Sequence, residues 1–391
     1  DYFPLYVGNH ILGGSGLVAW VAPPQTWDSL NYHMSRVAHW AQDRSVGYFA
    51  TGIENQNSRP PMAEMAVLHL YVLAQGDHFA NFVAWSALLG CAVGASAIAA
   101  RLGAKPAGQW LASLCVMTLP MALAQASSTM NDIVVAFWMV CAALELLVLA
   151  REGWDWSAAV FLASAAGLGI LTKPTGLLYL LPFALAAAWV LVRRAGIRRT
   201  VLAAGMALLV VGTINAGYLA RSIPTYGGPF ESGQTAIHLN RVLDPRVVVS
   251  NVLRNASLHL GTPNPYVNKA MYLAIDAVHR WIGLDPSDPR TTAHGDFEIN
   301  APSTIETRAG NPLHMVLAIV VFGVLVLRRR RFEGLAFGFA LTVAGTFVSV
   351  SWLLQWQVFG SRYHLPIFVL MAPLIGLVLA EARSRLGYLK D

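Results

Sequence analysis

Residues 175–199, TGLLYLLPFALAAAWVLVRRAGIRR, join an uncharged apolar run to two pairs of arginines at 193–194 and 198–199. A second apolar run follows at 200–220. Each run is close to the roughly 20 residues that an α-helix needs to cross the hydrocarbon core of a bilayer. The stretch therefore predicts two membrane-spanning helices joined by a basic loop, and such loops are typical of the cytoplasmic side.

The composition of the whole chain also indicates a membrane protein. Of its 391 residues, 55% are hydrophobic and 12% are charged, whereas a soluble domain carries about 25% charged residues. We therefore predict an all-α polytopic membrane protein. The net charge is +6, and the arginine clusters flank apolar segments. This placement indicates that the arginines orient the helices in the membrane and contact anionic lipid. It does not favour a nucleic-acid partner.

Similar apolar segments recur along the chain. About ten spans are predicted, at 4–22, 79–101, 107–125, 130–150, 156–172, 175–192, 200–220, 311–327, 334–353 and 363–380. The predicted inner connections are basic, and the short outer turns carry only Lys173, so every inner connection agrees with one orientation. Long outer regions follow at 23–78 and 221–310. These features divide the chain into a transmembrane core at 1–220, a long outer loop at 221–310 and C-terminal transmembrane helices at 311–391.

The first outer region predicts an amphipathic helix lying in the membrane interface. Its apolar residues recur with helical spacing at Leu30, Met34, Val37 and Ala41. Asp28, Tyr32 and Arg36 are spaced by four, so they would share a second face of that helix. Asp28 follows the first predicted span and is a candidate general base for an attacking hydroxyl. The alternative is that Asp28 serves as the N-cap of the interfacial helix.

Two further residues are predicted on the outer side. Asp132 opens the fourth predicted span, either as a helix-terminal charge or as a second acid that shares a substrate or divalent ion with Asp28. Lys173 lies in the outer turn between the segments 156–172 and 175–192. It is either a phosphate-binding cation or a lysine that extends from the bilayer to the interface.

Further candidates for a polar cleft on the same side are Arg36, Glu54, Arg59, Glu64, Arg221, Arg362 and His364. Most residues of this kind are solvated or paired. Glu145 lies within a predicted span toward the inner side, and we interpret it as structural. No glycine-rich phosphate loop, zinc spacing or haem spacing occurs in the sequence. A divalent metal, if one binds, would have Asp28 and Asp132 as its candidate ligands.

The order of these motifs resembles the GT-C superfamily of polytopic glycosyltransferases, in the bacterial branch related to protein O-mannosyltransferases and the lipid A aminoarabinose transferase. The resemblance is carried by Trp27-Asp28-Ser29-Leu30-Asn31-Tyr32-His33 with Arg36, Arg59-Pro60-Pro61 with Glu64, Asn131-Asp132, Thr172-Lys173-Pro174-Thr175-Gly176 and Ser361-Arg362-Tyr363-His364-Leu365-Pro366. It covers residues 15–220 well and the last third of the chain loosely.

This resemblance implies the inverting transfer of a sugar from a polyprenyl-phosphate donor to an unknown acceptor. It implies that Asp28 is the base, that Asp132 shapes the site, and that Lys173 or Arg362 binds the carrier phosphate. Related enzymes often have an Asp-Glu pair in the first loop, whereas Ser29 follows Asp28 here. The implied location is the bacterial inner membrane, with the active site on the extracytoplasmic face.

Two other functions compete with this prediction. A transporter or flippase for a lipid-linked sugar would need access from both sides of the membrane and usually contains repeated halves. No such repeat is found in the sequence. A non-catalytic subunit of a membrane complex that retains this fold is the other alternative.

Overall fold

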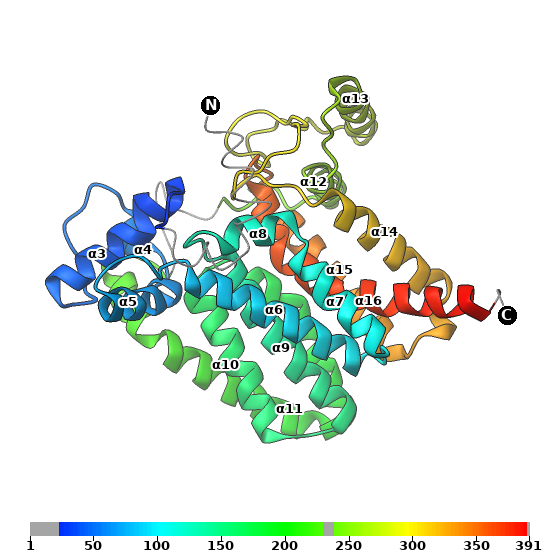
Figure 1. Cartoon of the computed structure of the whole chain (residues 1–391), viewed down its shortest axis with the longest axis horizontal. Helices are drawn as coiled ribbons and strands as arrows, with labels where there is room; N and C mark the ends of the chain where they lie inside the picture. The colour runs from blue at the N-terminus through cyan, green and yellow to red at the C-terminus, as the bar shows by residue number, and fades with distance from the viewer. Residues whose placement is uncertain (1–22, 230–237, 389–391) are drawn as a thin grey trace.

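The computed structural model describes residues 23–229 and 238–388, and this part of the chain is built from helices (Figure 1). Between them, the described residues form two isolated β-bridges and no strand. The predicted all-α fold is confirmed. The first predicted span, 4–22, lies outside the described residues.

Each of the other predicted spans contains a helix. The helices are α6 (Phe82–Arg101), α7 (Pro106–Met117), α8 (Pro120–Ala126), α9 (Asp132–Glu152), α10 (Trp156–Thr172), α11 (Gly176–Tyr226), α14 (Pro312–Leu327), α15 (Gly334–Leu353) and α16 (Leu365–Tyr388). Within the described residues, 5 helices are long and apolar enough to span a membrane, or 6 if α7 and α8 form one broken span. The predicted number of ten spans is therefore not confirmed.

Two of these elements depart from straight single spans. Helix α11 has 51 residues but is interrupted at Gly196, whose φ of 81° and ψ of 164° are not helical. This break separates the two apolar runs on either side of the arginine pairs. Helices α7 and α8 are bent by 61°, and α8 starts with Pro120, which has no amide hydrogen to extend the preceding helix.

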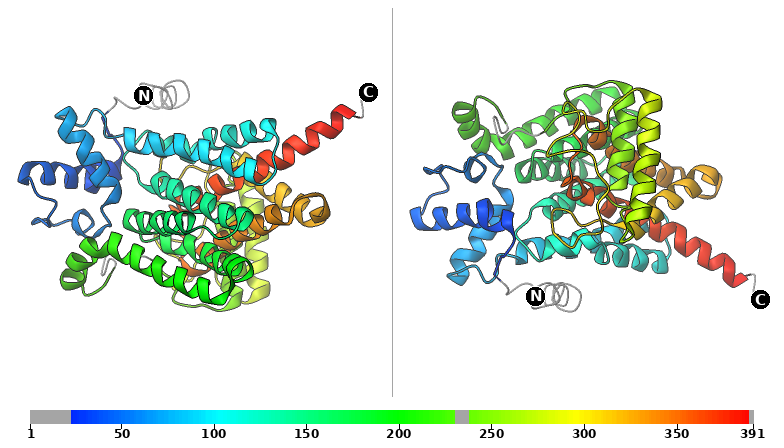
Figure 2. Two further views of the ribbon diagram at one scale, coloured as in Figure 1. Left: turned by 90° about the horizontal axis from the view of Figure 1, so that it is seen from below. Right: turned by 90° about the horizontal axis from the view of Figure 1, so that it is seen from above.

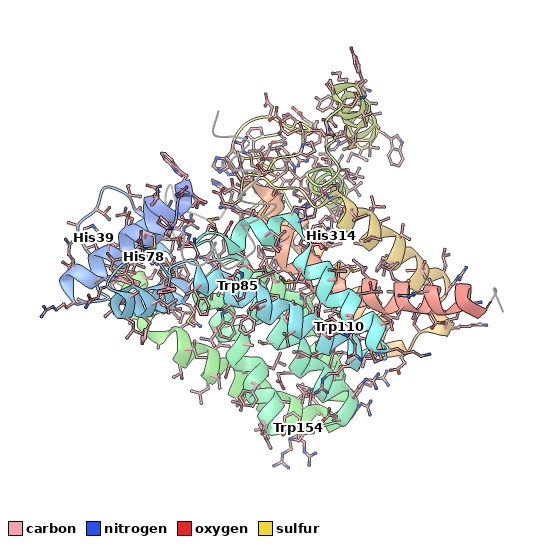
Figure 3. All side chains as sticks on the ribbon, viewed as in Figure 1. His39, His78, Trp85, Trp110, Trp154 and His314 are labelled. Carbon is pink, nitrogen blue, oxygen red and sulfur yellow. The ribbon has the colours of Figure 1, made fainter. Side chains whose placement is uncertain are left out.

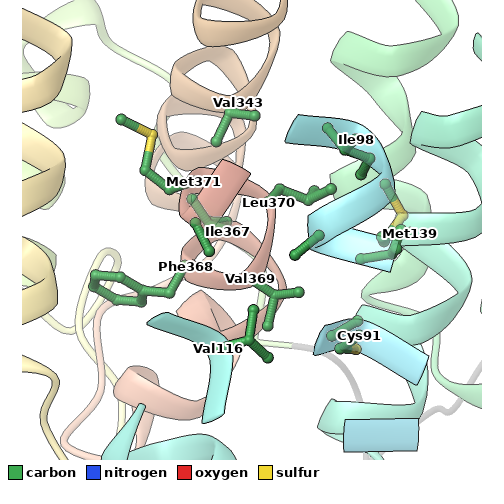
Figure 4. Packing of buried hydrophobic residues seen from close by; sticks show 14 of the residues in the cluster. Cys91, Ile98, Val116, Met139, Val343, Ile367, Phe368, Val369, Leu370 and Met371 are labelled. Atoms are coloured by element: carbon green, nitrogen blue, oxygen red, sulfur yellow. The ribbon is translucent and has the colours of Figure 1, made fainter. Parts of the chain in front are cut away.

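The core is formed around α16, which packs against α6, α7 and α9. Figure 4 shows Ile367, Val369 and Leu370 of α16 among Val116 of α7 and Ile98 of α6. Alanine is the commonest residue in this buried cluster. Small side chains let helix backbones approach closely, and such approach is a main source of packing energy between membrane helices.

One close crossing in this core joins α7 and α16. A Cβ atom added at Gly376 would overlap the carbonyl oxygen of Gly108 and lie 2.8 Å from the amide nitrogen of Ala112. The contacted atoms belong to the backbone, so they cannot move aside as a flexible side chain would. Gly376 therefore permits a helix contact that no larger residue allows.

We expect Gly376→Val to lower the stability of the protein by about 1–3 kcal/mol or more, because overpacking forces backbone shifts. The measurement is the unfolding temperature of purified protein in detergent. Gly323→Val in α14 is the matched control, because a Cβ at Gly323 meets nothing within 4 Å. Equal unfolding temperatures for the two variants would contradict the prediction.

The basic connections meet at one end of the helices. Arg101 Nη1 lies 2.7 Å from Glu152 Oε1, and Arg151 pairs with Glu333. These ion pairs join the end of α6, the end of α9 and the connection between α14 and α15. Figure 3 shows Trp154 of the α9–α10 connection at this end, away from the outer loops. The residues predicted on the inner side thus lie together, while their side of the membrane remains a prediction.

The first outer region forms a small helical layer at one edge of the molecule (Figure 1). It contains the π-helical turn η2 (Ser29–His33), α3 (Met34–Asp43), α4 (Asn55–Ser58) and α5 (Met62–Ala74). Met34 and Val37 of α3 are buried against α5, as the amphipathic pattern predicted. Leu30, however, is 55% exposed.

The π-helical turn explains this difference. A π-helix closes i→i+5 hydrogen bonds, so its side chains do not follow α-helical spacing. Residues on the two sides of the turn are therefore rotated about the helix axis from the positions that a continuous α-helix would give them. Tyr32 OH still lies 3.3 Å from Asp28 Oδ2. Arg36 instead points into a buried cluster with Glu64. The prediction that Asp28, Tyr32 and Arg36 share one face is therefore wrong for Arg36.

The second outer region contributes two helices and several ordered loops. Helices α12 (Pro245–Ser257) and α13 (Pro265–Ile282) lie side by side over the ends of the spanning helices (Figure 2). Asp244 and Asn264 cap their first turns by accepting hydrogen bonds from backbone amides. The loops around them form one wall of the cavity described next.

Candidate active site

A cavity of about 510 Å³ lies where the outer loops meet the ends of the spanning helices. Four separate parts of the chain line it: the first outer region, the turn between α10 and α11, the second outer region and the segment before α16. The lining residues are Trp27, Asp28, Asn55, Arg59, Lys173, Pro174, Thr175, His238, His294, Ile305, Glu306, Thr307, Leu354, Gln357, Phe359, Arg362 and Tyr363.

Asp28 and Arg362 form an ion pair in the wall of this cavity. Arg362 Nη1 donates to Asp28 Oδ2 at 2.8 Å, and the side chains of Arg362 and Asp28 are 16% and 20% exposed. Burial raises the pKa of Asp28, but the charge of Arg362 and its hydrogen bond lower it more, so the pKa lies below its ordinary value of 3.8. The carboxylate is therefore ionised at neutral pH and remains within reach of a molecule in the cavity.

Asp132 and Lys173 form a second ion pair close by. Lys173 Nζ lies 2.5 Å from Asp132 Oδ1, and their side chains are 9% and 1% exposed. Lys173 lines the cavity, whereas Asp132 lies behind it. The Tyr363 ring connects the two pairs, because Lys173 Nζ and Arg362 Cζ lie 5.2 Å and 5.3 Å from its centroid. Both cations thus face one region of the cavity.

The side chain of Ser29 links two loops that are far apart in the sequence. Its hydroxyl oxygen accepts from the backbone amide of Thr129 at 3.2 Å and from Thr26 Oγ1 at 2.7 Å. Asn131 Nδ2 then donates to the carbonyl oxygen of Thr172 at 3.3 Å. The turn that carries Asp28 is therefore fixed against the turn that precedes Asp132, and that turn is fixed against Lys173.

Arg36 and Glu64 do not line the cavity. They form a buried cluster with His33, whose Nδ1 lies 2.6 Å from Glu64 Oε1, while Arg36 Nη1 lies 3.7 Å from Glu64 Oε2. Burial raises the pKa of Glu64, but the hydrogen bond with His33 and the charge of Arg36 lower it more, so the pKa lies below 4.5. Arg36 also donates to the carbonyl oxygen of Gln56. This cluster joins α3, α4 and α5.

Arg221 also lies away from the cavity. Its Nη1 donates to the carbonyl oxygen of Val46 at 2.7 Å, and its guanidinium lies 5.8 Å from the ring of Tyr48. These contacts attach the end of α11 to the first outer region. Of the predicted site residues, the structure therefore brings together Asp28, Tyr32, Arg59, Asp132, Lys173 and Arg362. Glu54 and His364 do not line the cavity.

Five lining residues come from the long second outer region and were not predicted: His238, His294, Ile305, Glu306 and Thr307. The His238 and His294 ring centroids are 4.7 Å apart, and burial lowers the pKa of both histidines below 6.5. Burial raises the pKa of Glu306, whose carbonyl oxygen accepts from Gln125 Nε2 at 2.9 Å. The sequence around these residues contains no motif or helical period that points to a site. Their place depends on how the loop folds back over the helices.

The two candidate metal ligands are both engaged by cations. Arg362 forms an ion pair with Asp28, and Lys173 forms an ion pair with Asp132. Among the described residues, no group of three or more His, Cys, Asp or Glu side chains is arranged to hold a metal ion. A divalent ion at either carboxylate would therefore lie beside the positive charge of Arg362 or Lys173, which disfavours its binding.

Comparisons with known proteins agree with the resemblance in the sequence. Residues 76–217 match the model of the dolichyl-phosphate-mannose-protein mannosyltransferase family. No curated protein matches the chain. The structure of ArnT from Cupriavidus metallidurans bound to undecaprenyl phosphate superposes with a TM-score of 0.58 at 15% identity. The apo structure of the same protein has a TM-score of 0.47 at 15% identity and covers 96% of this chain and 78% of ArnT.

The first of these superpositions covers 97% of this chain but 60% of ArnT, so the chain spans less than two thirds of the solved structure that it resembles. At this identity the likeness shows the fold. Together with the family match, it confirms the predicted resemblance to the GT-C superfamily.

Proposed function

We propose that this GT-C-type membrane protein is a glycosyltransferase that moves a sugar from a polyprenyl-phosphate carrier to an acceptor hydroxyl. The observation that carries the proposal is the convergence of Asp28, Arg362 and Lys173 on one cavity. The transfer needs a base near the hydroxyl, which an ionised carboxylate supplies, and positive charge near the phosphate. The family match to a dolichyl-phosphate-mannose-dependent enzyme and the likeness to ArnT bound to undecaprenyl phosphate support a donor of this class.

The proposed reaction proceeds with inversion in a single displacement. The acceptor oxygen bonds to the anomeric carbon on the face opposite the carrier. The bond from that carbon to the phosphate oxygen breaks, and its electron pair leaves with the polyprenyl phosphate. Asp28 takes the hydroxyl proton. Inversion requires no covalent enzyme intermediate, so one carboxylate is sufficient for the proton transfer.

Arg362 and Lys173 have the complementary role in this proposal. Negative charge grows on the carrier phosphate as the bond breaks, and two cations placed there stabilise it. Arg362 lies between Asp28 and the proposed phosphate position, so a bound phosphate competes with Asp28 for its hydrogen bonds. Binding of the donor then weakens the Asp28–Arg362 pair and makes the carboxylate a stronger base at the moment when one is needed.

A direct test uses purified protein and undecaprenyl-phosphate mannose in detergent or vesicles. An enzyme releases undecaprenyl phosphate when a suitable acceptor is present. A flippase moves the lipid across a vesicle membrane without cleaving it, and a non-catalytic subunit does neither. Relocation without release would overturn the proposal in favour of transport.

Removal of Arg362 tests the proposed phosphate site. We expect Arg362→Ala to weaken binding of undecaprenyl phosphate by about ten- to hundredfold, because a hydrogen bond to a charged group contributes roughly 1.5–3 kcal/mol. Native mass spectrometry or a competition assay measures the affinity. Arg221→Ala is the matched control, because Arg221 lies in an outer region but does not line the cavity. Equal losses in the two variants would argue against a phosphate site at Arg362.

A further inference from the structure

A second cavity, of about 650 Å³, lies between α9, the first half of α11 and α15. It is at the basic end of the molecule. Arg151, which lines it, follows Asp132 by 19 residues of the same helix, a distance of roughly 28 Å. The proposed transfer reaction makes no use of this cavity.

The walls of this cavity are apolar and its mouth is cationic. Leu146, Val190 and Phe339 are among the wall residues, and Arg193 and Arg194 lie at the mouth. Both arginines are exposed at the end of the first half of α11. A groove of this kind presents hydrocarbon-compatible surface next to positive charge, which is the pattern of a lipid with an anionic headgroup.

The contacts of the mouth residues leave positive charge available. Arg193 Cζ lies 4.5 Å from the ring of Trp189, and Arg194 Nη2 donates to the carbonyl oxygen of Ala150 at 2.8 Å. Neither contact neutralises a guanidinium. Arg151 is paired with Glu333, so the mouth retains a net positive charge from Arg193 and Arg194.

Helix α15 leaves open space along its side of the groove. A Cβ atom added at Gly334 or Gly338 would meet nothing within 4 Å. Thr342, one turn further, donates its hydroxyl to the carbonyl oxygen of Gly338 at 3.0 Å, which leaves its methyl group as the apolar surface. From Gly334 to Thr342 this open wall extends for about 12 Å along the helix.

We propose that this groove binds a glycerophospholipid with an anionic headgroup. Its acyl chain lies along α15 between Gly334 and Thr342, and its phosphate is bound by Arg193 and Arg194. Guanidinium groups suit phosphate because their N–H donors match its oxygens, often in pairs. A zwitterionic lipid fits the apolar wall equally well, but the two cations contribute less to its binding free energy. The proposal is independent of the proposed transfer reaction.

The first test measures binding of phosphatidylglycerol and phosphatidylcholine to the purified full chain by native mass spectrometry. We expect Arg193→Ala/Arg194→Ala to weaken phosphatidylglycerol binding by at least about tenfold, because it removes two charge-assisted contacts. Arg328→Ala/Arg329→Ala is the matched control. It removes two exposed arginines at the same end that do not line this cavity, and it should retain binding.

The second test fills the groove without changing its charge. Gly338→Leu places a side chain in the open space, and we expect it to weaken phosphatidylglycerol binding while the lipid-free unfolding temperature stays unchanged. Gly323→Leu on α14 is its control, because a Cβ there also meets nothing within 4 Å. Equal effects of both arginine pairs would show general attraction to an anionic surface and would overturn the proposal. Equal binding of phosphatidylcholine, or preferential binding of undecaprenyl phosphate at the groove, would also overturn it.

Discussion

Asp28→Asn is expected to reduce the rate of sugar transfer by about 10²–10⁴-fold, the usual effect of losing a general base. Asparagine has nearly the same shape and can still accept the hydrogen bond from Arg362, so the cavity should keep its form. Binding of undecaprenyl phosphate should be retained, because Arg362 loses a competing negative charge. The measurements are release of undecaprenyl phosphate, lipid affinity and unfolding temperature.

The control for this variant is Asp43→Asn, which removes an exposed acid from α3 in the same outer region. It should transfer sugar at the rate of the unchanged protein. Normal turnover by Asp28→Asn would remove Asp28 from the mechanism. If Glu306→Gln then abolished transfer, the proton acceptor would be Glu306, which lines the same cavity and whose pKa is raised by burial.

Glu64→Gln is expected to lower the stability of the protein by about 3–5 kcal/mol, the usual cost of breaking a buried ion pair by removing one partner. Glu64 and Arg36 are each 1% exposed, so the variant leaves the Arg36 charge buried without its counter-charge. The pKa of Glu64 is lowered in the folded protein. Its contribution is therefore present above the ordinary value of 4.5 and is lost as pH falls through the lowered pKa.

The unfolding temperature in detergent measures this effect. Glu54→Gln is the matched control, because Glu54 lies in the same outer region, is less buried and makes no capping hydrogen bond. A variant Glu64→Gln that unfolded normally but bound undecaprenyl phosphate weakly would instead favour the substrate-binding role predicted from the sequence.

The sequence was sufficient to predict the class of fold and part of the cavity. Apolar length and arginine placement predict helices that cross a membrane and share one orientation, and this places Asp28, Lys173 and Arg362 at the same depth. Depth alone does not give proximity, because Arg221 closes a predicted span on the same side and lies away from the cavity. In the structure these three residues line one cavity.

The remaining features depend on information that residue spacing does not carry. The π-helical turn at Ser29–His33 changes the rotation of the interfacial helix, so Arg36 turns away from Asp28 toward Glu64. Glu306 and His294 reach the cavity through the folding of a long loop with no repeating pattern. The length of each apolar helix also depends on breaks in the helix, such as those at Gly196 and Pro120. A hydropathy average taken over many residues does not detect such breaks.

The core of small residues has a consequence for which sequence changes this chain tolerates. In a core rich in leucine, truncation to alanine removes many atoms and is the damaging change. In the bundle around α16 many buried positions are already alanine or glycine, so truncation has little left to remove. The damaging changes are gains in volume at points such as Gly108 and Gly376. Natural variation in this bundle should therefore have an upper limit on side-chain volume, which is set by the largest side chain that each helix crossing can accommodate.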